Sequence, residues 1–429
     1  MRRQLSLFDC FGIGINGIIG SGIFLLPTAL HRRAGGRSPI AWLIAGALCV
    51  LVALCFAEAA GRTEKSGGPY RYACDAFGPH VGFGVGWVTL ASTLFGYAAV
   101  SRGFAEHAAL LIGGKGSSLV EGAIAVLLVV FLSILNIFGV KSSARTSDAV
   151  GVVKMLALLA FVVVGLMHVR GSTLTSAPVP HAGETTGIAA AAFAGLFACT
   201  GFEYVPVPAG ETINPKRTVG LAMVLSVVGA TIIYALIQIV AMSTAADLAE
   251  SKTPLVDAAR GFAGSMGATV MAGVAVISAF GFCASSALIG PRYVESFAQD
   301  RFLPGWLEGR HPRLGTPVSA IVVSSLLVMV LAVSLDFSQL ADTSVIAVVV
   351  QYVSTCVSIL VMRRREPRDP NAFRIPFGYL VPVAAITGSV LFLFSVAVSE
   401  LWLAGGLLGG GLVVGMVTRR TRPAPAPSG

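Results

Sequence analysis

Residues 12–24 read Gly-Ile-Gly-Ile-Asn-Gly-Ile-Ile-Gly-Ser-Gly-Ile-Phe and lie inside a longer apolar run. Glycine in a membrane helix usually marks close helix packing, but this stretch holds more glycine than packing requires. Glycine tolerates non-helical dihedrals and leaves backbone N–H groups accessible. We interpret Gly20, Ser21 and Gly22 as a backbone break near mid-membrane, where a half-helix begins and points the positive end of its dipole at a carboxylate. A small-residue packing face is the alternative interpretation.

The composition around this stretch is that of a membrane protein. The chain has 429 residues, of which 55% are hydrophobic and 12% charged, and its mean hydropathy is +0.82; soluble domains carry about 25% charged residues. Apolar runs of about 20 residues, long enough to cross the bilayer, recur along the whole chain. We expect an all-α integral membrane protein with a single membrane domain, residues 1–429. The expected helices, about 12 in all, are 7–30, 39–61, 81–112, 119–140, 148–169, 187–209, 219–243, 264–292, 317–335, 343–362, 379–398 and 400–418.

The net charge of +9 follows the membrane topology. With the N-terminus inside, about 21 of the 30 basic residues fall in cytoplasmic segments and about 7 in outside loops, as the positive-inside rule requires. This explanation removes the need for a nucleic-acid partner. We expect a multi-pass protein of the cell membrane with both termini cytoplasmic, a tail at 419–429, and short loops that favour a prokaryotic inner membrane.

A second interruption lies about 180 residues after the first. Residues 197–210 read Phe-Ala-Cys-Thr-Gly-Phe-Glu-Tyr-Val-Pro-Val-Pro-Ala-Gly. Two prolines and a glutamate do not fit an undistorted lipid-facing helix. Paired breaks in the first and sixth helices indicate an inverted-repeat transporter with its substrate at the midplane. The repeats are expected at 7–169 and 187–362, followed by two appended helices at 379–418.

These features resemble the amino acid–polyamine–organocation (APC) family of amino acid permeases. The resemblance covers nearly the whole chain and implies the LeuT-like fold, a five-plus-five inverted repeat with helices 1 and 6 unwound mid-membrane. One departure is Pro206 with Pro208, where the family has small helix-forming residues, so their effect on the unwound segment stays open. The matching motifs are residues 20–27, 66–72, 201–203 and 211–217, together with 290–292, 300–304 and 315–317 within the segment 290–317.

The resemblance implies a substrate site built mainly from backbone groups. The substrate carboxylate is expected on the amides at 20–22 and the Ser21 hydroxyl, and the ammonium on carbonyls near Ile18 and Thr200. An aromatic gate is expected at Phe197, although ordinary core packing is the alternative. The charge pattern favours a small or neutral amino acid. The full expected set is Ile18, Gly20, Ser21, Gly22, Phe197, Thr200 and Gly201.

Lys154 lies well inside the fifth apolar run, where an unpaired ammonium is costly. A desolvated lysine sheds its proton more readily, which makes Lys154 a candidate proton carrier. The resemblance implies that its amino group fills the space of the sodium ion in sodium-coupled relatives, so sodium coupling is disfavoured. A permanently charged strut is the alternative. The expected coupling set is Lys154, Gly17, the eighth-helix hydroxyls Ser285 and Ser286, and Glu203, for which a fixed hydrogen bond to unwound backbone is the alternative.

The sequence therefore predicts a secondary transporter that imports a small or neutral amino acid by proton symport and alternating access. An amino acid or amine exchanger and a non-transporting sensor are the alternatives. No cofactor or metal is expected, because the seven cysteines lack C-x-x-C spacing and the histidines lack H-E-x-x-H. No nucleophile, base and oxyanion donor cluster as an enzyme requires. The expected partners are the amino acid, a proton and the bilayer; a homodimer through the glycines at 405–411 is left open.

Overall fold

The structure is a computed structural model that describes residues 6–62, 68–111, 118–138, 143–169, 177–179, 186–206, 212–365 and 373–394, and a few positions between 402 and 413. Helices make up nearly all of the secondary structure in these ranges. They are α1 (Leu7–Ile18), α2 (Gly22–Ala34), η1 (Gly35–Arg37), α3 (Ser38–Arg62), α4 (Gly68–Phe77), α5 (Pro79–Leu111), α6 (Ser118–Phe138), α7 (Ser143–Leu166), α8 (Ile188–Cys199), η3 (Phe202–Tyr204), α9 (Pro215–Thr244), α10 (Pro254–Gln299), η5 (Gly305–Leu307), α11 (Val318–Ser334), α12 (Phe337–Arg365) and α13 (Leu380–Leu393).

Within the described residues, six helical runs are long and apolar enough to cross a membrane. Shorter apolar helices, among them α1, α8, α11 and α13, lie beside them. This arrangement agrees with the expected all-helical membrane protein. The expected twelfth helix at 400–418 lies mostly outside the described residues, although four of the five glycines at 405–411 are described and exposed; the tail at 419–429 lies wholly outside them.

The expected first helix, 7–30, is present as two helices. Ser6 and Asp9 cap the start of α1 reciprocally in a capping box. The helix ends at Ile18, Ile19 leaves helical dihedrals with φ −82° and ψ 86°, and α2 begins at Gly22. Residues 19–21 therefore belong to neither helix.

The expected sixth helix, 187–209, also ends early. α8 stops at Cys199, and Gly201 takes φ 111° before the short η3. Pro206 follows η3, whereas Pro208 lies outside the described residues. The expected eighth helix, 264–292, is part of the longer α10, which changes direction where Gly264 has φ 63°.

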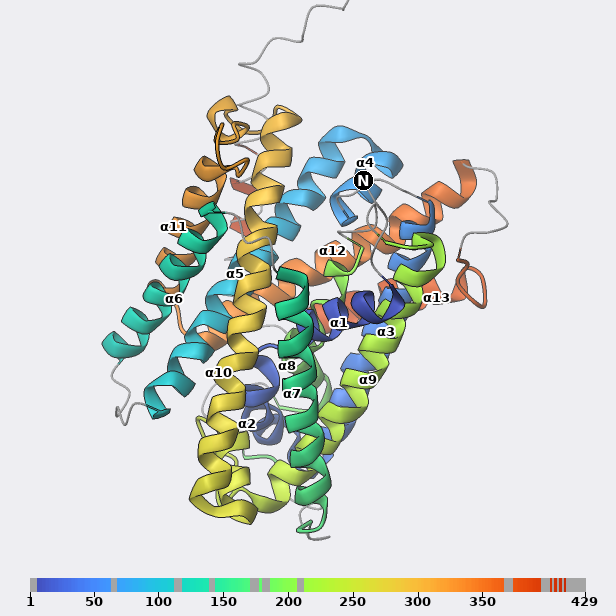
Figure 1. Ribbon diagram of the computed structural model, residues 1–429. Helices are drawn as coiled ribbons and strands as arrows, with labels where there is room; N and C mark the ends of the chain where they lie inside the picture. Colours follow the sequence, from blue (N-terminus) through green and yellow to red (C-terminus); the bar gives the residue numbers. More distant parts are fainter. Residues whose placement is uncertain are drawn as a thin grey trace, which may run out of the picture.

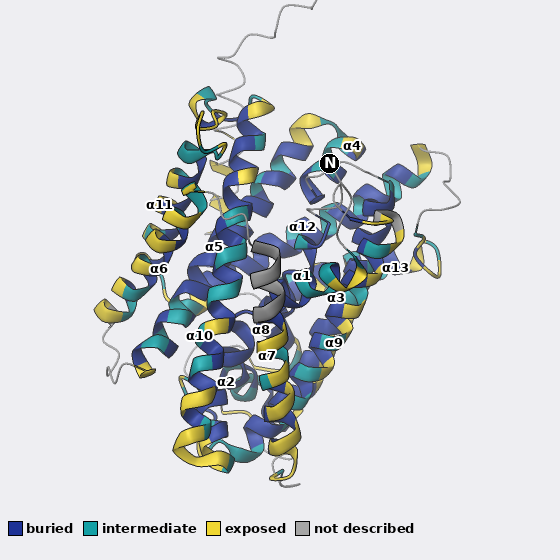
Figure 2. Cartoon of the chain, viewed as in Figure 1, coloured by how far each residue is buried: buried dark blue, intermediate teal, exposed yellow. Residues whose placement is uncertain are grey.

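The helices pack in a bundle whose outer faces are apolar. α3 runs along α9, α5 contacts α10 and α12, and α6 pairs with α11 at the opposite flank (Figure 1). Exposed side chains concentrate on outward faces such as that of α6 (Figure 2), where Leu119, Leu127, Phe131 and Phe138 are exposed. Such a surface suits contact with lipid. The short helices α1, α2 and α8 lie in the middle of the bundle, and they position the site.

Candidate functional site

The two interrupted segments touch each other through glycine. A Cβ atom added to Gly17 would lie 2.5 Å from the carbonyl oxygen of Gly201, and one added to Gly201 would overlap the carbonyl oxygen of Gly17. Only a residue without a side chain allows two backbones to approach this closely. The φ of 111° at Gly201 adds a second requirement for glycine. Segments that are distant in sequence therefore meet at one point.

The start of α2 faces this meeting point with free donors. By helix geometry, the first amides of α2 lack a carbonyl partner within the helix and carry the positive end of its dipole. The Phe24 amide already donates to the Ser21 carbonyl at 3.0 Å, so the open donors are the amides of Gly22 and Ile23. Ser21 stands at the N-cap without a side-chain cap bond. Its hydroxyl is buried, and among the described residues it has no hydrogen-bond partner. An anionic group placed here would satisfy the amides, while the Ser21 side chain lies against Gly103 of α5 and is not among the residues that line the cavity described below.

The carbonyls of Ile18 and Thr200, which are expected to hold the substrate's ammonium, differ in the hydrogen bonds that they already accept. The Ile18 carbonyl accepts the Gly20 amide at 3.0 Å and the Tyr234 hydroxyl at 3.2 Å. Because a carbonyl oxygen has two lone pairs, Ile18 is fully engaged. Within the described ranges no donor reaches the Thr200 carbonyl, while the Thr200 hydroxyl donates to the Phe197 carbonyl at 2.7 Å. Thr200 is therefore the better of the two acceptors.

Lys154 of α7 contacts the backbone at the end of α1. Its side chain is fully buried, and Nζ donates to the carbonyls of Asn16 at 3.2 Å and Ile19 at 2.7 Å. In the described part of the chain no carboxylate pairs with this amino group. These two carbonyls flank Gly17, where the resemblance placed the amino group. The amine thus stabilises the end of α1 by hydrogen bonds rather than by an ion pair.

The hydroxyl that accompanies Lys154 belongs to Ser278 rather than to Ser285 or Ser286. Ser278 donates to the carbonyl of Ile19 at 2.9 Å, so it shares an acceptor with Lys154, and to that of Gly20 at 3.1 Å. Ser285 instead donates to a carbonyl of its own helix, at Gly281, and Ser286 is buried with no hydrogen-bond partner among the described residues. Ser278 lies two helical turns earlier, and the sequence does not show which turn of this helix faces Ile19.

Glu203 is held by backbone and by α12. Its Oε2 accepts the amide of Gly201 at 2.8 Å and the hydroxyl of Tyr352 at 3.4 Å. The carboxylate is buried at 5% exposure. Its contacts match the alternative of a fixed hydrogen bond to the backbone after α8, and they join that backbone to α12.

A narrow cavity adjoins both interruptions. Phe197 forms one wall and packs edge-on against Phe337, with ring centroids 5.8 Å apart. Helices α5, α10 and α12 supply wall residues that the sequence did not single out. These helices are continuous beside the cavity, so no glycine or proline break in the sequence indicates where the cavity lies. One of these, Ser344, donates to the Ser92 carbonyl at 3.0 Å. The lining residues are Ile18, Gly20, Gly22, Ser92, Gly96, Val100, Phe197, Ala198, Thr200, Glu203, Tyr204, Phe282 and Ser344.

Similarity to known proteins covers nearly the whole chain. Residues 5–406 match the amino acid permease family. The chain belongs to this family. The permease is 28% identical to the serine/threonine exchanger SteT of Bacillus subtilis (strain 168), with 98% of each chain covered. It is 26% identical to the branched-chain amino acid permease BcaP of the same organism, over 90% of this chain and 86% of that one.

A solved structure supports the fold. The permease matches Mhp1, a nucleobase-cation-symport-1 family transporter solved in a closed conformation with bromovinylhydantoin bound, at a TM-score of 0.59 and 15% identity. The match covers 97% of this chain and 92% of that one. At this identity the likeness concerns the fold alone. Together with its apolar helices, family membership makes the permease a membrane protein of the APC family.

Proposed function

We propose that this permease imports a small neutral amino acid by proton symport, with the substrate held between residues 19–22 and 200–203. The contact that carries the proposal is the one from Lys154 to the carbonyls of Asn16 and Ile19. It puts a group that can gain and lose a proton directly on the backbone beside the site. In this proposal the fold is a five-plus-five inverted repeat, with repeats at 7–169 and 187–362. The expected helices 1 and 6 are unwound where they contact each other.

The substrate's charged ends are matched by main-chain dipoles. The carboxylate binds the first amides of α2, and the ammonium binds the Thr200 carbonyl. The side chain enters the cavity between Phe197 and Phe282. Among the described residues that line the cavity, Glu203 is the one with an acidic side chain, and it already accepts two hydrogen bonds. A short uncharged side chain therefore fits this wall best.

Proton coupling follows from what Lys154 can donate. A protonated amine has three N–H groups and a positive charge, and it holds both carbonyls at the end of α1. A neutral amine donates less strongly and carries no charge, so these bonds weaken. The end of α1 is then freer to move relative to α7 and α10. In this scheme protonation favours the bound arrangement, and proton loss to the cytoplasm favours release.

Exchange is the second candidate, because the relative SteT is named an exchanger. Uptake of labelled serine and alanine into proteoliposomes separates the two mechanisms. Symport predicts accumulation into empty vesicles under an inward proton gradient. Uptake confined to vesicles preloaded with amino acid would contradict symport and support exchange, whereas binding without uptake would indicate a sensor.

The role of Lys154 is tested in the same assay. Lys154→Met removes the amine and is expected to abolish gradient-driven accumulation. Lys252→Met is the matched control, because Lys252 is an exposed lysine outside the site. Accumulation that persists in Lys154→Met would rule out Lys154 as the coupling group.

A further inference from the structure

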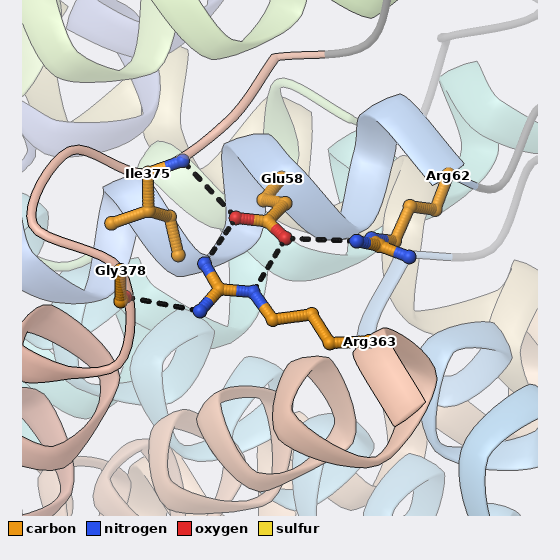
Figure 3. A network of polar contacts seen from close by, with 5 residues as sticks. All are labelled: Glu58, Arg62, Arg363, Ile375 and Gly378. Carbon is orange, nitrogen blue, oxygen red and sulfur yellow. Dashed lines mark hydrogen bonds and ion pairs between the residues drawn. The ribbon is translucent and has the colours of Figure 1, made fainter. Parts of the chain in front are cut away.

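A buried ion pair joins three segments: the end of α3, the end of α12 and the chain that leads into α13. Glu58, near the end of α3, is 1% exposed. Arg363 of α12 donates to both of its carboxylate oxygens, from Nε at 2.8 Å and from Nη2 at 2.6 Å (Figure 3). The amide of Ile375 adds a bond at 3.1 Å. This two-point geometry is the strongest that arginine and a carboxylate form.

The segment that leads into α13 is bound by the same guanidinium. Nη1 of Arg363 donates to the carbonyl of Gly378 at 3.0 Å, and the guanidinium carbon lies 5.3 Å from the ring centre of Tyr379. Arg62 also contacts Glu58, at 3.2 Å, but it belongs to the same helix as Glu58. Arg363 is therefore the side chain through which the carboxylate connects α3 to α12.

Packed aromatic rings connect α3 and α12 to the backbone that follows α8. Phe56 of α3 packs edge-on against Tyr352 of α12, at 5.9 Å between ring centres, and against Phe202 of η3, at 5.8 Å. Tyr352 in turn donates to Glu203, which binds the amide of Gly201. Helix α3, the middle of α12 and the backbone after α8 are thus in contact with one another.

We infer that the Glu58–Arg363 pair is a latch that holds this end of the permease closed and opens when substrate leaves there. The inference rests on the proposed alternating access and on the cytoplasmic side that the positive-inside rule gives to Arg62 and Arg363. A dry ion pair with full hydrogen bonding is stable, whereas one that opens to water has both charges solvated. Such a contact has two discrete states, which is what a gate requires.

Two native thiols report the state of the latch. Cys55 lies three residues before Glu58 and Cys356 seven before Arg363, and both are fully buried and free. Opening between α3 and α12 would expose them to a water-soluble maleimide. Cys74 on α4 is partly exposed and serves as the internal reference. Mass spectrometry of the labelled peptides gives the rate at each thiol in the full-length protein.

Glu58→Gln and Arg363→Gln each remove one charge, and the first also keeps the shape of the side chain. We expect labelling of Cys55 and Cys356, relative to Cys74, to rise about tenfold in both variants, because a lone buried charge favours the hydrated state. Arg62→Gln is the matched control: it removes a cation from the same carboxylate without removing the link between helices. Its labelling is expected to match the unaltered protein. An equal rise in Arg62→Gln, or no rise in the other two, overturns the latch.

A double variant separates gating from misfolding. Glu58→Gln with Arg363→Gln removes both charges of the pair, so neither remains as a lone buried charge while the strong bond stays absent. Labelling should remain raised, and a return to the unaltered level overturns the inference. Binding of labelled serine and alanine to the unaltered protein is measured in parallel. Absence of binding counts against the proposed transport function, while the labelling rates still report whether the ends of α3 and α12 separate.

Discussion

Two buried cations are held in this permease in opposite ways. Arg363 has a carboxylate partner, Glu58, and two parallel hydrogen bonds to it. Lys154 has two backbone carbonyls, and within the described residues no carboxylate pairs with it. Arginine keeps its proton in proteins, whereas a buried lysine can release it. The comparison indicates that the ion pair suits a mechanical contact, and that the lysine suits a cycle of protonation.

The largest effect on stability is expected at the ion pair. Arg363→Ala leaves the Glu58 carboxylate buried without its main partner, which should lower the free energy of unfolding by about 3 kcal/mol. Thermal unfolding in detergent measures this change. The neighbouring Arg364→Ala is the control, because Arg364 is exposed and should shift the midpoint little. Equal midpoints for the two variants would contradict a structural role for the pair.

An intermediate effect is expected for Ser278→Ala. The change removes the hydroxyl that donates to the carbonyls of Ile19 and Gly20. A loss of about 1 kcal/mol in stability is expected, as for other buried hydrogen bonds, together with a several-fold weaker affinity for substrate in an equilibrium binding assay. Ser285→Ala is the matched control, because its hydroxyl bonds only within its own helix. A larger loss of affinity in Ser285→Ala would show that the wrong hydroxyl has been assigned.

Lys154→Met should separate stability from function. Its lost hydrogen bonds are offset by the removal of an unpaired buried amine, so we expect the free energy of unfolding to change by under about 1 kcal/mol. The thermal midpoint should therefore stay near that of the unaltered protein even though coupling is lost. A destabilisation as large as that of Arg363→Ala would identify Lys154 as a structural cation.

The smallest effect is expected for Arg62→Ala. Arg62 and Glu58 form an i, i+4 pair within α3, and such pairs contribute about 0.3–0.5 kcal/mol. Chemical denaturation that follows helix content measures the difference from Arg363→Ala. A loss for Arg62→Ala that equals the loss for Arg363→Ala would remove the distinction between the pair within one helix and the pair between helices.

The sequence predicted features that depend on local chemistry. Apolar runs predicted the membrane helices, and glycine and proline marked positions such as Gly20 and Gly201, beside which helices end. Contacts between distant helices left no such mark. Ser278 could not be distinguished from Ser285 without knowing which turn of α10 faces Ile19. Arg363 looked like an ordinary cytoplasmic charge until packing placed it on Glu58.

The central claim is that protonation of Lys154 couples proton entry to substrate entry. A pH-sensitive dye sealed inside proteoliposomes measures it directly when serine or alanine is added outside. The unaltered permease should acidify the interior, and Lys154→Arg, which keeps a cation but cannot release its proton, should not acidify it while still binding substrate. Equal acidification by both proteins would contradict the account.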